Sequence, residues 1–311
     1  MRFYITEAEN GTLIRDFIRQ ALKPSSKMLK YLKYRADGIL VNSEHKTVRY
    51  VLRAGDVLDV AVDDGEASEK VAPVDLPLDI LYEDDDLIIP SKPAQMPTHP
   101  SHDHYRDTVA NALAYRFVQK NIPFVFRPIN RLDRNTSGLL LIAKNKLSAG
   151  RMTRAMGRGE IKKTYFAVLD GEMEIGSGVI DACLHRTAKS IIVREVCSPD
   201  APDADPACTE YTVLLAKNGH TLVQARPITG RTHQLRVHFA SLGHPITGDD
   251  LYGTPCDLIG RHALHAATLT FPHPATQESM TLTAPLAPDM KELIEGLFGS
   301  DITELACNRE A

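Results

Sequence analysis

The sequence lacks the features that mark a secreted, disulfide-bonded or membrane-spanning protein. Its five cysteines, at positions 183, 197, 208, 256 and 307, are odd in number and form no Cys-x-x-Cys pair. This spacing argues against a disulfide framework and against a structural zinc site, and it favours the cytoplasm. No stretch approaches the roughly 18 apolar residues that a membrane helix needs, so we expect no membrane association. The N-terminus, MRFYITEAEN, has no basic segment followed by an apolar run, so we expect no signal peptide.

The chain also lacks the excess of positive charge that is typical of nucleic-acid-binding proteins. It has 36 Lys and Arg residues against 40 Asp and Glu residues, a formal net charge of -4. The charge is nevertheless segregated. Residues 12–62 and 127–163 each contain ten basic residues, whereas residues 63–86 contain ten acidic residues and one lysine. Two basic segments around an acidic one indicate a two-point contact with a polyanion, although solvated surface faces would give the same pattern.

The length of 311 residues predicts two domains, and the acidic segment divides them. Pro73 and Pro77 interrupt that segment, which is typical of a linker. We therefore predict a small N-terminal domain over residues 12–62, an acidic linker over 63–75, a larger domain over 76–296 and a C-terminal tail over 297–311. A short insert, PDAPDADP at residues 199–206, adds further acidic charge, and the sequence assigns it no function.

The N-terminal segment shows two short amphipathic helices followed by short strands. Apolar residues from Leu13 to Leu22 follow helical spacing, and Ser25 after Pro24 is placed to cap a second helix. GILVN and AGDVLDV then predict two strands joined by turns. This order resembles the S4 RNA-binding domain. The resemblance implies that the lysines around the turn and the second helix bind RNA: Lys23, Lys27, Lys30 and Lys33.

The larger segment mixes strands and helices without a regular alternation. Apolar runs at 80–82, 87–89 and 139–143 predict strands, and residues 108–117, 147–156 and 232–242 have helical patterns. Asn218-Gly219 between two β-rich runs predicts a hairpin. The fold class predicted is therefore α+β, with a mixed, mainly antiparallel sheet and flanking helices.

Chemistry-bearing residues concentrate in two stretches. In RLDRNTSG, Asp133 lies between Arg131 and Arg134 in a turn-rich segment, where positive charge keeps a carboxylate ionised for use as a nucleophile or base. An Asx turn that pairs with a surface arginine would give the same pattern. In RPITGRTHQLR, Arg231 precedes a helix that Thr232 is placed to cap. A cation there is unfavourable unless it faces an anion, and Asp133 or a phosphate fits that role.

Together these stretches carry a strong resemblance to a known family. RLDRNTSGLLLIAK, KKTYFAVLDG, RPITGRTHQLRVHFASLGHPITGDDLYG, RHALHA and FPHP occur in the order and spacing of the RluA-type pseudouridine synthases, over about 220 residues. An S4 domain before this domain is usual in the branch that modifies large-subunit ribosomal RNA. The resemblance implies a monomeric, cytoplasmic isomerase that converts uridine to pseudouridine in RNA without a cofactor or metal.

The resemblance also implies roles for single residues. Asp133 matches the catalytic aspartate, Tyr165 the aromatic residue that stacks on the target uracil, and Arg231 the basic residue that forms a salt bridge with the aspartate. Strand alternation places Tyr165 on the face of Lys163, opposite a core face that includes Phe166. Arg131 matches the residue that takes the place of the flipped-out base. Further RNA contacts are expected from the basic residues nearby: Arg134, Lys163, His233 and Arg236.

One position departs from the family, and the sequence also contains residues typical of two other kinds of site. Many members have a histidine where this chain has Asn130, so a histidine base at that position is excluded. A serine-type triad of Ser137, His233 and Asp133 is a weak alternative, because the chain has no GxSxG motif. The close histidines His99, His102 and His104, and the pair His262 and His265, lack the pattern of a metal site.

The sequence leaves one alternative of another class open: a non-catalytic S4-type RNA-binding or ribosome-assembly factor. It also leaves open which uridine is modified. Two chemical routes remain possible, abstraction of the C2′ proton by Asp133 (a glycal route) and direct attack by its carboxylate.

Overall fold

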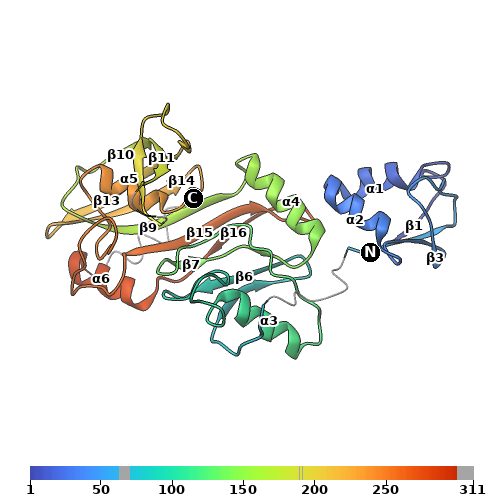
Figure 1. Cartoon of the computed structure of the whole chain (residues 1–311), viewed down its shortest axis with the longest axis horizontal. Coiled ribbons are helices and arrows are strands. Elements are labelled where there is room, and N and C mark those ends of the chain that lie inside the picture. The colour runs from blue at the N-terminus through green and yellow to red at the C-terminus, as the bar shows by residue number, and fades with distance from the viewer. Residues whose placement is uncertain (63–70, 189, 191, 300–311) are drawn as a thin grey trace.

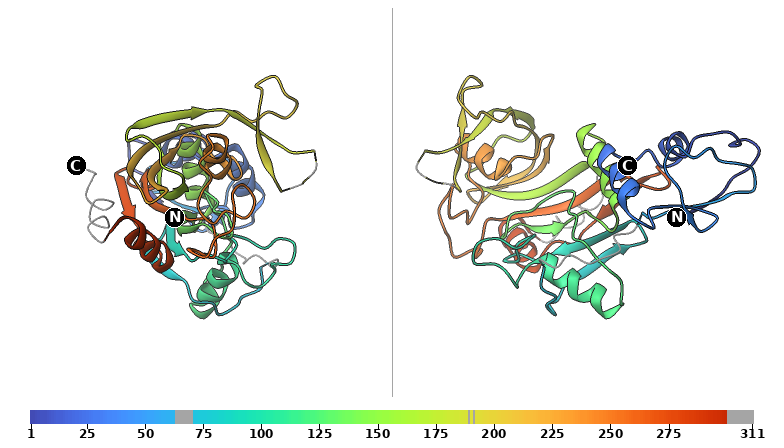
Figure 2. Two further views of the ribbon diagram at one scale, coloured as in Figure 1. Left: turned by 90° about the vertical axis from the view of Figure 1, so that its left-hand side faces the viewer. Right: turned by 45° about the vertical axis from the view of Figure 1, so that its right-hand side comes forward.

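The structure is a computed structural model that describes residues 1–62, 71–188, 190 and 192–299. Residues 63–70 of the predicted acidic linker (63–75) lie outside the described residues. Residues 300–311 of the predicted C-terminal tail (297–311) also lie outside them. Residues 71–75 pack against the larger domain, where Asn111 Nδ2 donates to the carbonyl of Ala72 at 2.7 Å. Residues 297 and 298 belong to the last helix. Figures 1 and 2 show an elongated molecule with the N-terminal module at one end.

The N-terminal module consists of two helices packed on a small antiparallel sheet. Its strand order is β1-β4-β2-β3. Ser25 caps the second helix, because its side chain accepts a hydrogen bond from the backbone nitrogen of Met28, as the sequence predicted. Strand β1 pairs with β4, so the module begins before residue 12, the predicted start of the domain. Its elements are β1 (Arg2–Tyr4), α1 (Ile14–Leu22), α2 (Ser26–Tyr34), β2 (Ile39–Val41), β3 (Glu44–His45) and β4 (Val57–Val60).

The larger domain is built on a ten-stranded sheet of order β10-β13-β14-β9-β15-β7-β6-β5, with β16 paired to β15 and β8 to β6. All strand pairs are antiparallel except β15 with β7, so the prediction of a mixed, mainly antiparallel sheet is confirmed. The strands are β5 (Asp79–Glu83), β6 (Leu87–Lys92), β7 (Ser137–Leu139), β8 (Ile142–Ala143), β9 (Lys162–Asp170), β10 (Ser177–Asp181), β13 (Cys208–Lys217), β14 (His220–Pro227), β15 (Leu264–Pro272) and β16 (Ser279–Thr283). A separate hairpin joins β11 (Cys183–Arg186) to β12 (Arg194–Cys197).

Helices cover both faces of the sheet, because its central strands are apolar on both sides. Along β6, Ile88 packs with the core beneath α3 (Val109–Gln119), whereas Leu87 and Ile89 pack with the core beneath α4 (Lys146–Gly157). Figure 1 shows α3 and α4 on opposite sides of the sheet. The remaining helices, α5 (Gln234–Ser241) and α6 (Pro288–Phe298), add buried side chains to the larger core.

Two predicted elements differ from the observed ones. The strand expected over 139–143 is divided into β7 and β8. Asn130 lies between the two parts, where its Oδ1 accepts a hydrogen bond from the backbone nitrogen of Leu141 at 2.7 Å. The helix expected from Thr232 begins at Gln234, because His233 adopts a left-handed backbone conformation with φ of 57°. No side chain caps α5, so the predicted cap at Thr232 is wrong.

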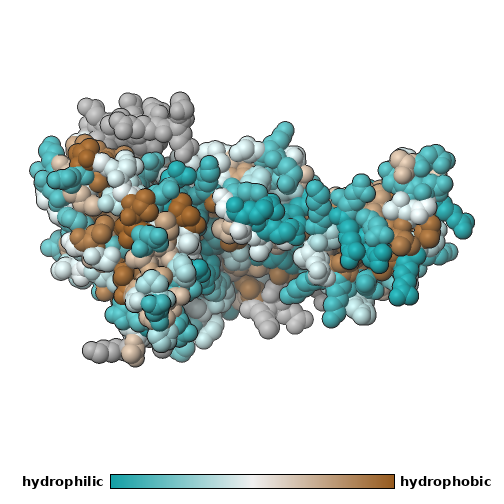
Figure 3. Space-filling model, turned by 90° about the horizontal axis from the view of Figure 1, so that it is seen from above, coloured by the Kyte–Doolittle hydropathy of each residue, from teal (hydrophilic) through white to brown (hydrophobic). Residues whose placement is uncertain are grey.

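Helix α4 joins the N-terminal module to the sheet. Leu147 packs in the core of the module. Arg151 Nη2 donates to the carbonyl of Leu22 at 3.0 Å, and Arg154 Nη2 donates to that of Lys23 at 2.6 Å. These carbonyls belong to the C-terminal end of α1, where cations are stabilised by the helix dipole. In Figure 3 the face of the molecule over the N-terminal module, at the right, is largely hydrophilic.

Candidate active site

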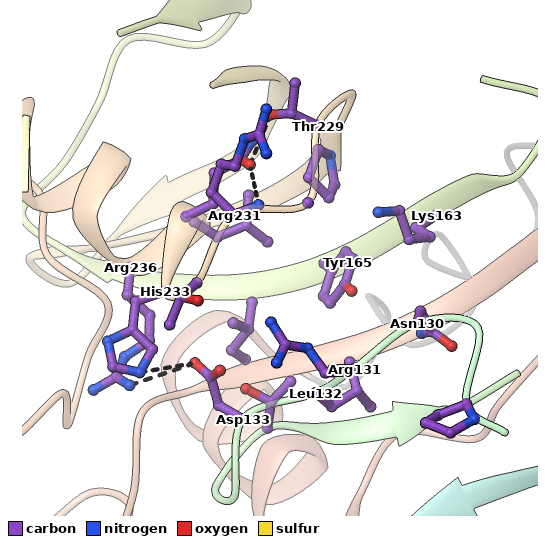
Figure 4. Close-up of a pocket in the computed structure, with 18 of the residues that line it drawn as sticks. Asn130, Arg131, Leu132, Asp133, Lys163, Tyr165, Thr229, Arg231, His233 and Arg236 are labelled. Atoms are coloured by element: carbon purple, nitrogen blue, oxygen red, sulfur yellow. Dashed lines mark hydrogen bonds and ion pairs between the residues drawn. The ribbon is translucent and has the colours of Figure 1, made fainter. Parts of the chain in front are cut away.

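A cavity of about 740 Å³ opens between the segment 128–136, strand β9 and the segment 227–236. It is the place where the two chemistry-bearing stretches of the sequence meet. Figure 4 shows Asp133 and Arg131 on one side of this cavity and Lys163 and Tyr165 extending into it from β9. Among the described residues, Asp133 is the only carboxylate that lines it. The cavity therefore combines one acid, one buried aromatic ring and several cations.

The backbone on both sides of Asp133 is held by buried side chains. Thr98 Oγ1 donates to the carbonyl of Leu132 at 3.0 Å. Lys92, which is 1% exposed, donates through Nζ to three carbonyls, at 2.8 Å from Pro93, 2.8 Å from Met96 and 2.9 Å from Arg134. These bonds fix the turn, while the Asp133 side chain remains 28% exposed and open to the cavity.

Arg236 is the basic residue that faces Asp133. Its Nη1 lies 3.5 Å from Asp133 Oδ2. The same guanidinium donates through Nε and Nη2 to the two oxygens of Asp249, both at 2.7 Å. Burial raises the pKa of Asp249, but the hydrogen bonds and charge of Arg236 outweigh burial and leave that pKa below its ordinary value. Asp250 Oδ1 lies 3.5 Å from Nη2, so Arg236 is a buried cation among three carboxylates. Of these, Asp133 is the one among the described residues that lines the cavity.

Arg231 does not form the predicted salt bridge with Asp133. Its Nε donates to the carbonyl of Pro206 at 3.0 Å, and its Nη1 lies 3.5 Å from Asp205 Oδ1, in the acidic insert. The prediction placed Arg231 beside the free amides of a helix N-terminus. The side chain of Gln234 accepts the hydrogen bond from the Arg231 backbone nitrogen instead, at 2.9 Å. The left-handed turn at His233 lies between the two arginines, and Arg236, inside α5, points toward Asp133.

His233 is a second neighbour of Asp133. Its Nε2 lies 3.9 Å from Asp133 Oδ2, and its Nδ1 shares a hydrogen bond of 2.8 Å with the hydroxyl of Tyr252. Burial lowers the pKa of His233 in spite of the opposing charge of Asp133, which favours the neutral imidazole. His233 and Arg236 were predicted as RNA contacts. Both lie at the carboxylate, and Arg236 is only 4% exposed, so its contacts are within the protein.

Tyr165 lies in β9 and is 7% exposed. Strand alternation places its ring on the same face as Lys163, and both residues line the cavity. The expectation of a core face opposite Tyr165 is incomplete, because both faces of β9 are buried, with Ala167 and Val168 at 0% exposure. Burial, followed by the charge of Asp133, raises the pKa of Tyr165, so its hydroxyl stays protonated.

The other predicted RNA contacts occupy different places. Arg131 is exposed and lines the cavity, whereas Arg134 is exposed beside it, with Nε 3.4 Å from the carbonyl of Gln95. The four lysines of the N-terminal module are exposed and lie outside the cavity lining: Lys23, Lys27, Lys30 and Lys33.

The serine-type triad is not assembled. Ser137 is 1% exposed, and its Oγ shares a hydrogen bond of 2.9 Å with His265 Nδ1 rather than with His233. Among the described residues there is no group of three or more His, Cys, Asp and Glu side chains that could hold a metal ion. In the same part of the chain, no helix is long and apolar enough to cross a membrane.

Three residues of this site were not singled out by the sequence analysis. Asp249 and Tyr252 lie in the quoted segment GDDLYG, and Lys92 is the last residue of β6, within SKPAQ. A carboxylate directly after Gly248, in a segment that the family resemblance already covered, was a signal that could have drawn attention to Asp249. Nothing in the sequence, however, shows that its partner is Arg236, thirteen residues earlier.

Comparisons with known proteins identify the family. Residues 86–241 match the model of the family described as RNA pseudouridylate synthase. The chain is 39% identical over 272 residues to the RNA pseudouridine synthase YjbO of Bacillus subtilis, which covers 88% of this chain and 95% of the relative. This chain belongs to the RluA-type RNA pseudouridine synthase family. The prediction of the family from the sequence motifs is confirmed.

Other relatives of this pseudouridine synthase match most of its length. Ribosomal large subunit pseudouridine synthase C of Vibrio vulnificus is 32% identical over 308 residues, 94% of this chain and 95% of the relative. The solved structure of human RNA pseudouridylate synthase domain containing 1 superposes with a TM-score of 0.58 at 29% identity. It covers 70% of this chain and 87% of the human chain.

Proposed function

We propose that this pseudouridine synthase modifies uridines in large-subunit ribosomal RNA and that Asp133 is its acting carboxylate. The observation that carries the proposal is the placement of Asp133, which is 3.5 Å from Arg236, open to solvent and the only acid in the cavity lining within the described part of the chain. The names of relatives that act on the ribosomal large subunit support the choice of RNA.

The reaction breaks the bond between uracil N1 and ribose C1′, turns the uracil and forms a bond between C5 and C1′. The proton on C5 is then released and N1 takes up a proton, so the product is an isomer of uridine. The target nucleotide must leave its stack to enter a closed site, so the site needs a planar surface for the base and an anion near the sugar. Tyr165 supplies the surface and Asp133 the anion. Both the glycal route and direct carboxylate attack use Asp133 at this position.

The cations divide into two roles under this proposal. Arg236 keeps the Asp133 carboxylate oriented and ionised, since it is itself fixed by Asp249. Arg131, exposed at the cavity, takes the place of the flipped-out base in the RNA. The lysines of the N-terminal module, with its S4-like order of helices and strands, bind phosphates at a second point. The protein acts as a cytoplasmic monomer and without a cofactor.

A non-catalytic RNA-binding or ribosome-assembly factor is the alternative. Such a protein would have no use for a carboxylate held beside a buried arginine and an aromatic ring in one cavity. The geometry of Asp133, Arg236 and Tyr165 therefore favours the enzyme.

The test is the mapping of pseudouridines in ribosomal RNA from cells with and without the protein. Purified protein is then assayed for tritium release from RNA that contains 5-tritiated uridine. We expect one or a few sites to lose their pseudouridine in its absence, and the wild-type protein to restore them in vitro. Unchanged pseudouridine maps, together with no tritium release from ribosomal RNA, would leave the RNA-binding factor as the better description.

A further inference from the structure

Lys163 is a buried cation that lines the cavity. It is 9% exposed and precedes Tyr165 by two residues on the same face of β9. Figure 4 shows its amino group extending into the cavity. A Cβ atom built on Gly230 would lie 3.5 Å from Lys163 Nζ and within 4 Å of no other atom. The absent side chain at Gly230 therefore leaves open space beside the ammonium group.

No hydrogen bond or ion pair of Lys163 Nζ occurs among the described residues. By contrast, the ammonium group of Lys92, which also lies near Asp133, donates to three carbonyl acceptors within 2.9 Å. The single carboxylate in the cavity lining, Asp133, is already engaged by Arg236. Nζ itself is not sealed from solvent, so water in the cavity solvates it. An anion that displaces this water would meet a cation that no described protein group engages.

We propose that Lys163 binds a backbone phosphate of the flipped-out uridine. This inference rests on the proposed function, in which the base of that nucleotide stacks on Tyr165. Residues two apart in a strand are separated by about 6.6 Å, a distance that one nucleotide spans between its base and its phosphate. A phosphate compensates the charge of the ammonium, whereas a uracil carbonyl would leave the charge unbalanced.

The proposal also accounts for two properties of this side of the cavity. Burial lowers the pKa of Lys163, and an adjacent phosphate would reverse that effect by favouring the charged form. Gly230 does not adopt a left-handed backbone conformation, so its φ does not require glycine. A side chain at position 230 would instead fill the space beside Lys163 Nζ.

The experiment compares binding of uridine and uridine 3′,5′-bisphosphate to the full-length protein, measured by NMR titration. We expect the bisphosphate to bind the wild-type protein about tenfold more tightly than uridine, in line with a charge-assisted hydrogen bond. In Lys163→Met this ratio should fall toward one while the affinity for uridine stays unchanged. Lys163→Gln, with a polar but uncharged side chain, should behave like Lys163→Met.

Lys162→Met is the matched control. Lys162 is the neighbouring lysine on the opposite face of β9 and is exposed, so its replacement should leave the ratio at the wild-type value. Thermal unfolding of each variant shows that the fold is intact. An equal phosphate advantage in wild type and Lys163→Met would overturn the proposal. A loss of uridine affinity in Lys163→Met as large as the loss for the bisphosphate would also overturn it, because Lys163 would then contact the base or ribose.

The pseudouridine assay on the wild-type protein separates this proposal from the proposed function. Active wild-type protein whose phosphate advantage survives in Lys163→Met contradicts only the role of Lys163. Wild-type protein that forms no pseudouridine in ribosomal RNA contradicts the proposed function itself.

Discussion

Arg236 and Asp249 form a two-bond ion pair from which solvent is excluded. Nε and Nη2 of the arginine each lie 2.7 Å from a carboxylate oxygen, and the side chains are 4% and 0% exposed. Asp249 also accepts hydrogen bonds from the backbone nitrogens of Leu251 and Tyr252. Because the pair fixes the plane of the guanidinium, the remaining nitrogen, Nη1, is directed at Asp133. Asp249 is therefore a positioning residue for the candidate catalytic carboxylate.

Replacement of Asp133 tests the chemistry most directly. Asp133→Asn keeps the size of the side chain and removes its negative charge, so we expect turnover to fall below detection. RNA affinity should change little, because phosphate contacts elsewhere carry most of it. Single-turnover pseudouridine formation and RNA binding are measured on the same preparation, after mass spectrometry has excluded deamidation. Measurable turnover by the intact Asn variant would contradict the role of Asp133.

Replacement by methionine should be strongly destabilising at Arg236 and nearly neutral at Arg231. Arg236→Met leaves Asp249 buried without its partner, which lowers the free energy of unfolding by about 3–5 kcal/mol, and it removes the cation beside Asp133. Arg231 lies in a partly exposed pair with Asp205, so Arg231→Met should cost less than about 1 kcal/mol and leave the saturated rate near normal.

Arg236→Lys separates the effect of the positive charge beside Asp133 from that of the two-bond contact with Asp249. An ammonium restores the positive charge but cannot donate to both oxygens of Asp249 in one plane, so we expect partial recovery of activity. Urea unfolding and single-turnover rates at saturating enzyme check both arginines. A normal saturated rate for Arg236→Met, together with an abolished rate for Arg231→Met, would assign the pairing to Arg231 after all.

Tyr165 should affect nucleotide binding through its ring rather than its hydroxyl. Tyr165→Phe keeps the stacking surface, so its affinity for RNA that contains the target uridine should stay close to the wild-type value. Tyr165→Ala removes the surface and should weaken binding by about 1–3 kcal/mol. Equilibrium titrations with fluorescently labelled RNA measure both. Equal affinity of the Phe and Ala variants would show that no base stacks on Tyr165.

The lysines of the N-terminal module should set the salt dependence of RNA binding. Each phosphate contact removed should reduce the slope of log K against log salt by about 0.7–0.9. We expect Lys27→Gln, Lys30→Gln and Lys33→Gln together to flatten the slope by up to about 2–3 and to leave the saturated rate unchanged. Lys291→Gln in α6 is the control for a general loss of charge.

Point substitutions are preferable here to deletion of residues 1–70. Deletion would expose Leu147, which the N-terminal module covers, although the catalytic domain should still fold on its own sheet. An unchanged salt slope in the triple variant would contradict an RNA-binding role for these lysines.

Two buried histidines should make stability depend on pH. Burial lowers the pKa of His262 to about 3 and that of His265 to about 4, whereas both titrate near 6.5 in the unfolded chain. Below pH 6.5 the unfolded state therefore binds more protons than the folded state. The stabilising contribution is complete above that pH and is lost as the pH falls toward the folded values.

At pH 5 the loss should be about 2 kcal/mol for each histidine. Urea unfolding at pH 7.5 and pH 5.0 measures it, and His265→Gln removes one of the two titrating groups. The difference in free energy of unfolding between the two pH values should then shrink by about 2 kcal/mol in this variant. An identical difference in wild type and His265→Gln would show that His265 is not buried in its neutral form.

Local elements could be predicted because their signals are local. The N-cap at Ser25, the strand around Tyr165 and the Asn218-Gly219 hairpin depend on a few neighbouring residues, and the structure contains all three, although β9 is buried on both faces and not on one. The motif around Asp133 also identified the family, because residue types and their spacing are properties of the sequence alone. The boundary of α5 was missed because the left-handed conformation of His233 has no signature in residue type.

The sequence by itself determined the family, the mixed sheet and the segment that carries the carboxylate. Only the tertiary structure decided which arginine pairs with Asp133. Arg231 and Arg236 are both close in sequence to the same turn, and both are chemically able to hold a carboxylate. The choice depends on the direction of α5 and on Asp249, which the fold brings to Arg236 and which binds two of its nitrogens. Long-range partners of this kind follow from packing, because burial of one charge is favourable only where the chain places its counter-charge.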